Sequence, residues 1–265
     1  MFLRCITLAA MGLLACACTV DSNYGGAGFA CSAEEPCQSG FDCSMGVCVA
    51  GAPGPDARPG DGPDSDAGEI VCLPPIALSD EFSGNALDAQ WTDISDNQTI
   101  VVVGGGVLTM TPRADSVPFR YAKVSSAAVD MAEKRVFAEI PTMVDTATAA
   151  IGYLFLRADF NSFYFMRQSQ GVLNFGTSTA GAELVVNATN YDPSTHRWWQ
   201  MRMTGGRIYA DVSSDGSNWV NLDSVDTNVI GASLSVELGA GTESAVSTPG
   251  TMDVDNVNAG SGLCL

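Results

Sequence analysis

The chain has a single histidine, His196, and few basic residues. Its 265 residues include 12 lysines and arginines against 30 aspartates and glutamates, for a formal net charge of −18 at pH 7. A surface this acidic repels polyphosphate, so we expect no nucleic acid partner. One histidine cannot form a histidine metal cluster, and we predict no cofactor and no metal site from it. We expect His196 to be a loop residue bonded to a neighbouring carbonyl.

Helical periodicity is also missing. No window of a dozen residues repeats its apolar side chains at a helical spacing. The 28 glycines and the many β-branched runs are typical of strands and turns. Hydrophobic residues make up 46 % of the chain, which is enough for a core. We therefore predict an all-β protein of one or two domains.

The N-terminus lacks an apolar run long enough to cross a bilayer as a helix. Arg4 precedes an apolar stretch at 5–14, which has the size of a signal-peptide core. The sequence LLAC at 13–16 resembles a bacterial lipobox. That resemblance implies a signal peptide over 1–15, lipidation of Cys16, and an exported protein that meets the membrane of the bacterial cell envelope only through its lipid. Ordinary secretion, with cleavage at a nearby small residue, is the alternative.

The cysteines lack the C-x2-C spacing and the nearby histidine of a zinc site. Export to an oxidising compartment favours disulfides instead. Four cysteines fall in a segment too short to bury a core, and three pairings are possible. A further pair brackets the rest of the chain and would meet if the first and last strands are neighbours, whereas Cys18 has no assigned partner. The predicted disulfide cysteines are Cys31, Cys37, Cys43, Cys48, Cys72 and Cys264.

Composition divides the mature chain into three parts. Residues 16–50 carry the lipid tether and the cysteine-rich module, which either binds a partner or acts as a spacer. Residues 51–71 are built from Gly, Pro, Asp and Ala and cannot offset their own ordering entropy, so we predict a flexible acidic linker. Residues 72–265 form the large domain.

The large domain is a succession of strands. Residues 100–112 and 197–213 have the glycine-containing turns of hairpins. Three strands follow one another within 149–176, and 234–241 and 250–258 supply the closing strands. Many short strands at near-regular spacing predict a two-sheet antiparallel sandwich.

Two stretches resemble domains of the concanavalin A-like lectin/glucanase superfamily. They are LSDEFSGNALDAQWTDI at 78–94, and the pairing of HRWWQMRMTGGRIYADVSSDGSNW at 196–219 with MDVDNVN at 252–258. The resemblance covers most of 78–258 and implies a jelly-roll sandwich with a convex and a concave sheet. In relatives the concave sheet often holds sugars.

Alternation sorts the strand at 197–203 into an apolar face for the core and a face that sets an aromatic ring beside planar polar groups. The partner strand at 207–213 extends both faces. Such a polar face suits a sugar, and the alternative is a solvated face with an ion pair across the strands. The strand at 151–159 offers a second amphipathic face. The groove candidates are Trp198, Gln200, Arg202, Tyr209, Asp211, Tyr153 and Arg157.

Catalytic residues are not recognisable. Glucanases of this superfamily need alternate carboxylates on one strand, in E-x-D-x-x-E or E-x-D-x-E, to flank the glycosidic bond. Glu139 and Glu237 each lack an acid two positions on, and Asp253 and Asp255 lack a glutamate. We therefore predict that the protein has no catalytic residues and is not an enzyme.

The resulting prediction is a monomeric, lectin-like lipoprotein that binds carbohydrate or glycan at the cell surface without catalysis. A structural or adhesive module that binds a surface protein is one alternative, and a glycoside hydrolase is another. Asp80, Glu81 and Asp255 belong to the first and last strands, where they either bind a structural calcium ion or cap turns.

Overall fold

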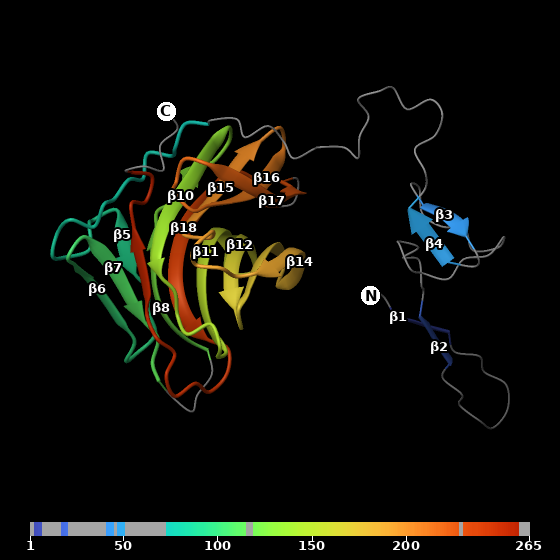
Figure 1. Ribbon diagram of the computed structural model, residues 1–265, viewed down its shortest axis with the longest axis horizontal. Helices are drawn as coiled ribbons and strands as arrows, with labels where there is room; N and C mark the ends of the chain where they lie inside the picture. The colour runs from blue at the N-terminus through green and yellow to red at the C-terminus, as the bar shows by residue number, and fades with distance from the viewer. Residues whose placement is uncertain are drawn as a thin grey trace. The chain divides into compact units, whose positions relative to one another are not determined.

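Figure 1 shows the computed structural model of the chain, which contains two compact units, 1–64 and 65–265. The first unit contains two short antiparallel pairs, β1 (Leu3–Ile6) with β2 (Ala17–Val20) and β3 (Phe41–Ser44) with β4 (Val47–Ala50). The structure describes residues 3–6, 17–20, 41–44, 47–50, 73–114, 119–227 and 230–259.

The structure does not describe the side chains of the cysteines for which we predict disulfides or lipidation. Cys43 lies opposite Cys48 in the β3–β4 ladder. The predicted lipidation of Cys16 and the predicted pairing of Cys72 with Cys264 fall outside the described residues, as do Cys31 and Cys37. These modifications stay predictions.

The second unit is a sandwich of two antiparallel sheets, which confirms the predicted fold class. One sheet has eight strands: β14-β13-β12-β11-β18-β8-β5 in order, with β9 pairing β18. Their bounds are β5 (Trp91–Asp93), β8 (Arg120–Ser126), β9 (Val129–Asp130), β11 (Ala150–Asp159), β12 (Ser162–Ser169), β13 (Val172–Thr179), β14 (Ala182–Asn190) and β18 (Ser233–Thr242).

The other sheet has seven strands, in the order β17-β16-β15-β10-β19-β7-β6. Their bounds are β6 (Ile100–Gly104), β7 (Val107–Thr111), β10 (Lys134–Thr142), β15 (Trp198–Thr204), β16 (Arg207–Ser213), β17 (Trp219–Asp226) and β19 (Met252–Asp255). In the described part of the chain, no helix is long and apolar enough to span a membrane.

The predicted hairpins form where glycine permits a left-handed backbone. Gly205 and Gly206, between β15 and β16, have φ of 58° and 77°. Gly105 and Gly106, between β6 and β7, have φ of 66° and 85°. Two consecutive residues of positive φ match the right-handed twist of the flanking strands, which explains these tight connections.

The two ends of the described sandwich meet. The N–H of Asp80 donates to the carbonyl of Val257 at 3.0 Å, and the N–H of Val257 donates back at 2.9 Å. The first and last segments of the described sandwich are therefore neighbours, which is the condition for the predicted pairing of Cys72 with Cys264.

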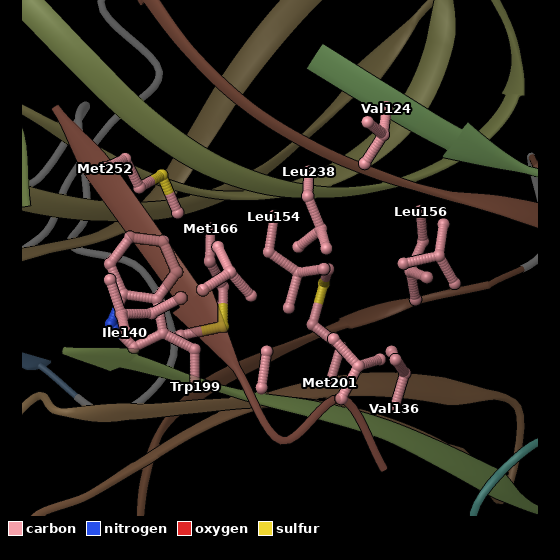
Figure 2. Close-up of a cluster of buried hydrophobic side chains, with 14 of the residues drawn as sticks. Val124, Val136, Ile140, Leu154, Leu156, Met166, Trp199, Met201, Leu238 and Met252 are labelled. Atoms are coloured by element: carbon pink, nitrogen blue, oxygen red, sulfur yellow. The ribbon is translucent and has the colours of Figure 1, made fainter. Parts of the chain in front are cut away.

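The core lies between the sheets and is built from alternate residues of each strand. Trp199 and Met201 of β15 are fully buried against Leu154 of β11 and Met166 of β12 (Figure 2). Because successive side chains of a strand point to opposite faces, the remaining residues of these strands face outward. The polar and charged side chains of these strands therefore lie on the two outer faces of the sandwich.

Candidate functional site

A pocket of about 270 Å³ lies on the outer face of the eight-stranded sheet. Its wall is formed by β8, β11, β12 and β18, which are neighbours in the sheet (Figure 1), and by the turns at the ends of β11 and β13. The lining residues are Tyr121, Lys123, Ile151, Tyr153, Phe155, Arg157, Phe160, Asn161, Phe163, Arg167, Ser178, Gly181, Glu183 and Glu237.

Glycines make room for the aromatic rings on this outer face. A Cβ atom on Gly239 would lie 2.3 Å from the ring of Tyr153, and one on Gly241 would lie 2.1 Å from the ring of Tyr121. Tyr153 is the direct neighbour of Gly239 in the β11–β18 ladder. The rings occupy the space that side chains on β18 would fill, so both positions require glycine.

The floor of the pocket is a row of stacked rings. Tyr153 and Phe155 stack with their centroids 4.1 Å apart, and Phe155 stacks on Phe163 at 4.8 Å. The guanidinium of Arg157 lies 4.5 Å from the centroid of Phe163. All three rings are buried, so they support the pocket without presenting a free ring face.

A buried carboxylate is held beside this floor. Glu237 is only 3 % exposed, and its Oε1 accepts a hydrogen bond from the Tyr153 hydroxyl at 2.9 Å. Its Oε2 lies 2.9 Å from Nε of Arg157. Burial, together with the charge of Glu237, raises the pKa of Tyr153 well above its ordinary value. The phenol therefore stays protonated and donates to the carboxylate.

Two turns form one rim of the pocket. The carbonyl of Asn161 accepts hydrogen bonds from the N–H of Gly181 at 2.9 Å and from Oγ of Ser178 at 3.0 Å, which ties the two turns together. Arg157 donates to the carbonyl of Phe160 at 2.9 Å. Phe160 is 82 % exposed at the rim, and the Arg157 guanidinium lies 5.9 Å from the centroid of its ring.

An arginine bridges two carboxylates at another part of the pocket wall. Nη2 of Arg167 lies 3.2 Å from Glu183, and its Nη1 lies 3.5 Å from oxygens of both Glu183 and Glu243. Tyr121 lies near this group, and burial, followed by the charge of Glu243, raises its pKa to about 12. Arg167 therefore joins Glu183 of β14 to Glu243, which directly follows β18.

The structure separates the seven predicted groove residues onto two faces. Tyr153 and Arg157 line the pocket, where alternation placed them. The other five face outward from the seven-stranded sheet, so the seven cannot form one groove. Alternation specifies whether a residue faces the core, but both sheets of a sandwich have an outer face. The five residues away from the pocket are Trp198, Gln200, Arg202, Tyr209 and Asp211.

Three of these five residues, Gln200, Arg202 and Asp211, belong to a buried polar network. Asp211 accepts hydrogen bonds from Gln200 at 2.9 Å, from Arg202 at 2.9 Å and from Asn221 at 2.8 Å. The Arg202 guanidinium lies 4.1 Å from the ring centroid of Tyr209. The ion pair expected as the alternative is formed, but Arg202 is 1 % exposed and Asp211 is fully buried, so it is not solvated. The ion pair joins β15 to β16 and so stabilises the sheet.

The tryptophan expected to bind sugar is also buried. Trp198 is 3 % exposed and lies 6.2 Å from Phe137 between ring centroids. Tyr153 is 2 % exposed. Neither ring is available for stacking on a ligand, whereas Phe160 is.

The single histidine lies in a loop and binds a neighbouring carbonyl, as predicted. The N–H of His196 donates to the carbonyl of Asp192 at 2.8 Å, and Nδ1 of His196 accepts a hydrogen bond from the N–H of Asp192 at 3.1 Å. Burial lowers its pKa, so the neutral imidazole acts as an acceptor that closes the loop.

Asp80 caps a turn. Its carboxylate accepts from the N–H of Phe82 at 2.8 Å and from Nε1 of Trp91 at 3.0 Å. Among the residues that the structure describes, no three histidine, cysteine or acidic side chains are grouped to hold a metal ion. Asp80 therefore matches the capping alternative to the calcium prediction.

Three residues that line the pocket were not among the predicted groove residues: Glu237, Arg167 and Phe160. Glu237 had a readable signal, because Val236 and Leu238 on either side face the core. Arg167 had none, since both faces of β12 are apolar around Phe163 and Phe165. Phe160 lies in a turn, where alternation ends.

No family model matches the sequence, and neither does any curated protein. Solved structures match the sandwich. A laminarinase from Flavobacterium sp. UMI-01 superposes with a TM-score of 0.54 at 9 % identity, over 69 % of this chain and 98 % of the laminarinase. The β-glucanase of Bacillus licheniformis gives 0.50 at 8 % identity, over 69 % and 96 %. The sandwich therefore has the concanavalin A-like jelly-roll fold.

The jelly roll also matches part of a larger enzyme. A xylan β-1,4-xylosidase from Bacillus halodurans C-125 superposes with a TM-score of 0.50 at 13 % identity, over 68 % of this chain and 38 % of the xylosidase. The jelly roll thus corresponds to a minor part of that protein.

The prediction that the protein is not an enzyme is wrong. It rested on the absence of one carboxylate motif, yet the matched jelly rolls are named as enzymes: a laminarinase, a β-glucanase and a xylosidase. A jelly roll whose neighbours are enzymes gives no ground for excluding catalysis.

Proposed function

We propose that the jelly roll recognises a glycan in the pocket above Glu237. The observation that carries the proposal is the exposed ring of Phe160 at the rim of a pocket whose floor holds a buried carboxylate bound by Tyr153 and Arg157. The glycan-directed names of the matched structures support the same class of ligand.

The pocket has the two kinds of surface that a sugar needs. The apolar C–H face of a pyranose stacks on an aromatic ring, which Phe160 presents. Its hydroxyls need donors and acceptors, which Asn161 and Glu183 place along the wall. The lining residues of β11 run from Ile151 to Arg157, about 20 Å of strand. That length exceeds one pyranose ring and suits an oligosaccharide.

The test compares two exposed apolar side chains on the full chain. Phe160→Ala removes the stacking ring, and Val220→Ala, at a 63 % exposed position on β17 outside the pocket wall, is the matched control. A glycan array identifies the ligand and calorimetry measures its affinity. We expect Phe160→Ala to weaken binding about tenfold and Val220→Ala to leave it unchanged. Equal affinities of the two variants would contradict the proposal.

Cleavage of the bound glycan is a second candidate function. Glu183 and Glu243 bind the same Nη1 atom of Arg167 at 3.5 Å, so two carboxylates lie close together beside the pocket. A pair of carboxylates is the usual requirement of glycoside hydrolysis. Release of reducing ends from the bound glycan, lost in Glu183→Gln and in Glu243→Gln, would establish it. Binding without release would leave recognition alone.

We also propose that the mature protein is anchored in the cell envelope through a lipid on Cys16. The sequence LLAC at 13–16 supports this proposal. Expressed in a bacterial host, the protein should incorporate labelled palmitate and partition into detergent. Cys16→Ser should abolish both, and labelling of that variant would refute the anchor.

A further inference from the structure

The pocket holds three cations, Lys123, Arg157 and Arg167. The carboxylates Glu183 and Glu237 also line its wall, and a third carboxylate, Glu243, lies beside it. The three cations differ in whether an acidic side chain binds them.

Both pocket carboxylates are already bound by arginine. Glu237 lies 2.9 Å from Nε of Arg157, and Glu183 lies 3.2 Å from Nη2 of Arg167. Arg167 has a second acid in Glu243, at 3.5 Å. The two arginines are thus neutralised by acids of the protein itself, which leaves Lys123 as the pocket cation without an acidic partner among the described residues.

Lys123 has no ion pair with any residue that the structure describes. Its ammonium lies 5.6 Å from the ring centroid of Tyr121, which is an attractive but weak contact. Lys123 lies opposite Gly239 in the β8–β18 ladder, and Gly239 lies opposite Tyr153 in the next ladder. Because Gly239 has no side chain, nothing on β18 separates the lysine from the pocket floor at this level.

We propose that the pocket selects an anionic saccharide, whose carboxylate or sulfate group binds the ammonium of Lys123 while another ring of the same chain stacks on Phe160. This inference rests on the proposed glycan recognition and adds the chemical class of the glycan. An ammonium within a half-buried wall is screened less by salt than one in open water, so an incoming anion gains a charge-assisted hydrogen bond there. A uronic acid and a sulfated sugar present the same anionic chemistry, and the experiment separates them.

The first measurement uses the full chain on an array that carries uronic acid, sulfated and neutral oligosaccharides. We expect the anionic members to bind and their neutral counterparts to bind at least tenfold more weakly. For a uronic acid ligand, the matched probe is the same oligosaccharide after reduction of its carboxyl groups to alcohols. For a sulfated ligand, it is the desulfated oligosaccharide.

The second measurement uses the only two lysines of the chain, Lys123 and Lys134. Lys123→Met keeps the aliphatic stem and removes the charge, and Lys134→Met does the same on β10 of the other sheet, where the lysine pairs with Asp130 at 3.6 Å. We expect Lys123→Met to abolish the preference for the anionic oligosaccharide over its neutral counterpart. Lys134→Met should retain the full preference.

Three outcomes overturn the inference. Equal affinity for the anionic and the neutral oligosaccharide would refute anion selection and leave glycan recognition standing. A preference that survives in Lys123→Met would refute the role of that lysine. Binding of no glycan at all would refute both the inference and the proposed function.

Discussion

The ring of Tyr153 lies over Gly239 on the neighbouring strand and donates its hydroxyl proton to Glu237 of that strand. One missing side chain thus creates the space for the ring that holds the buried carboxylate. The pocket floor therefore requires that β18 has no side chain at Gly239, because the ring of Tyr153 from β11 fills that space.

A methyl group on Gly239 should destabilise the protein. Its Cβ atom would lie 2.3 Å from a ring that is stacked on Phe155 and cannot retreat, so Gly239→Ala should cost about 1–3 kcal/mol of unfolding free energy. Gly104→Ala is the control, because no atom lies within 4 Å of its added Cβ, and it should change stability by less than about 0.5 kcal/mol. Urea unfolding measures both. Similar costs for the two variants would show that the ring moves freely.

Two buried tyrosines should respond differently to loss of their hydroxyl. Tyr153→Phe removes a donor from the buried carboxylate of Glu237, and we expect a loss of about 1–3 kcal/mol. The buried hydroxyl of Tyr164 has no hydrogen-bond partner among the described residues, so Tyr164→Phe should be neutral or stabilising. Thermal and urea unfolding of both variants tests the contrast. A destabilised Tyr164→Phe would reveal an ordered water on that hydroxyl.

Alkaline pH should unfold the protein between about pH 10 and 12. Burial raises the pKa of Tyr164 and Tyr191 to about 12, and burial together with the charge of Glu237 raises the pKa of Tyr153 well above its ordinary value. The unfolded chain loses these protons near pH 10, so their stabilising contribution is complete below pH 10 and disappears as pH rises towards 12. Melting temperatures and the absorbance of tyrosinate measured across this range provide the test.

Tyr164→Phe is the matched variant for this pH dependence, since it removes one group of raised pKa. Its stability should fall less steeply above pH 10 than that of the parent chain. Titration of every tyrosine near pH 10 in a protein that stays folded would contradict the prediction.

The buried ion pair of the seven-stranded sheet should matter far more than an exposed one. Asp211→Ala leaves Arg202 and Gln200 without their common acceptor, and breaking a buried pair in this way costs about 3–5 kcal/mol. Asp226→Ala breaks the exposed pair with Arg207 at 2.8 Å and should cost less than about 1 kcal/mol. Calorimetric unfolding separates the two. Equal small losses would mean that the network is dispensable for the fold.

Much of the fold was readable from the sequence, because its signals are local. The paired glycines at 105–106 and 205–206 marked hairpins, and alternation placed Trp199 and Met201 in the core. The site was only partly readable. Alternation showed that Tyr153 and Trp198 both point away from the core, but the two residues belong to different sheets. Assigning strands to sheets depends on long-range pairing, and periodicity carries no information about it.

The residues that complete the pocket were hidden for two other reasons. Phe160 is in a turn, and a turn has no inward or outward face to read. Arg167 follows a run of rings that face outward as well as inward, because the outer face of the sheet is itself covered with aromatic residues. Where apolar residues are buried on both faces of a strand, apolar and polar residues no longer alternate. The sequence then does not show which face is turned to the core.

Because glycines lie under its rings, the pocket floor tolerates fewer substitutions than the rim. At the floor, a side chain added at Gly239 or Gly241 clashes with a tyrosine ring. A single substitution of either glycine therefore displaces the ring that forms the floor. At the rim, exposed side chains such as Phe160 can be exchanged one at a time without disturbing their neighbours. A library aimed at new ligand preferences should therefore randomise Phe160 and Asn161 and keep Gly239 and Gly241 fixed.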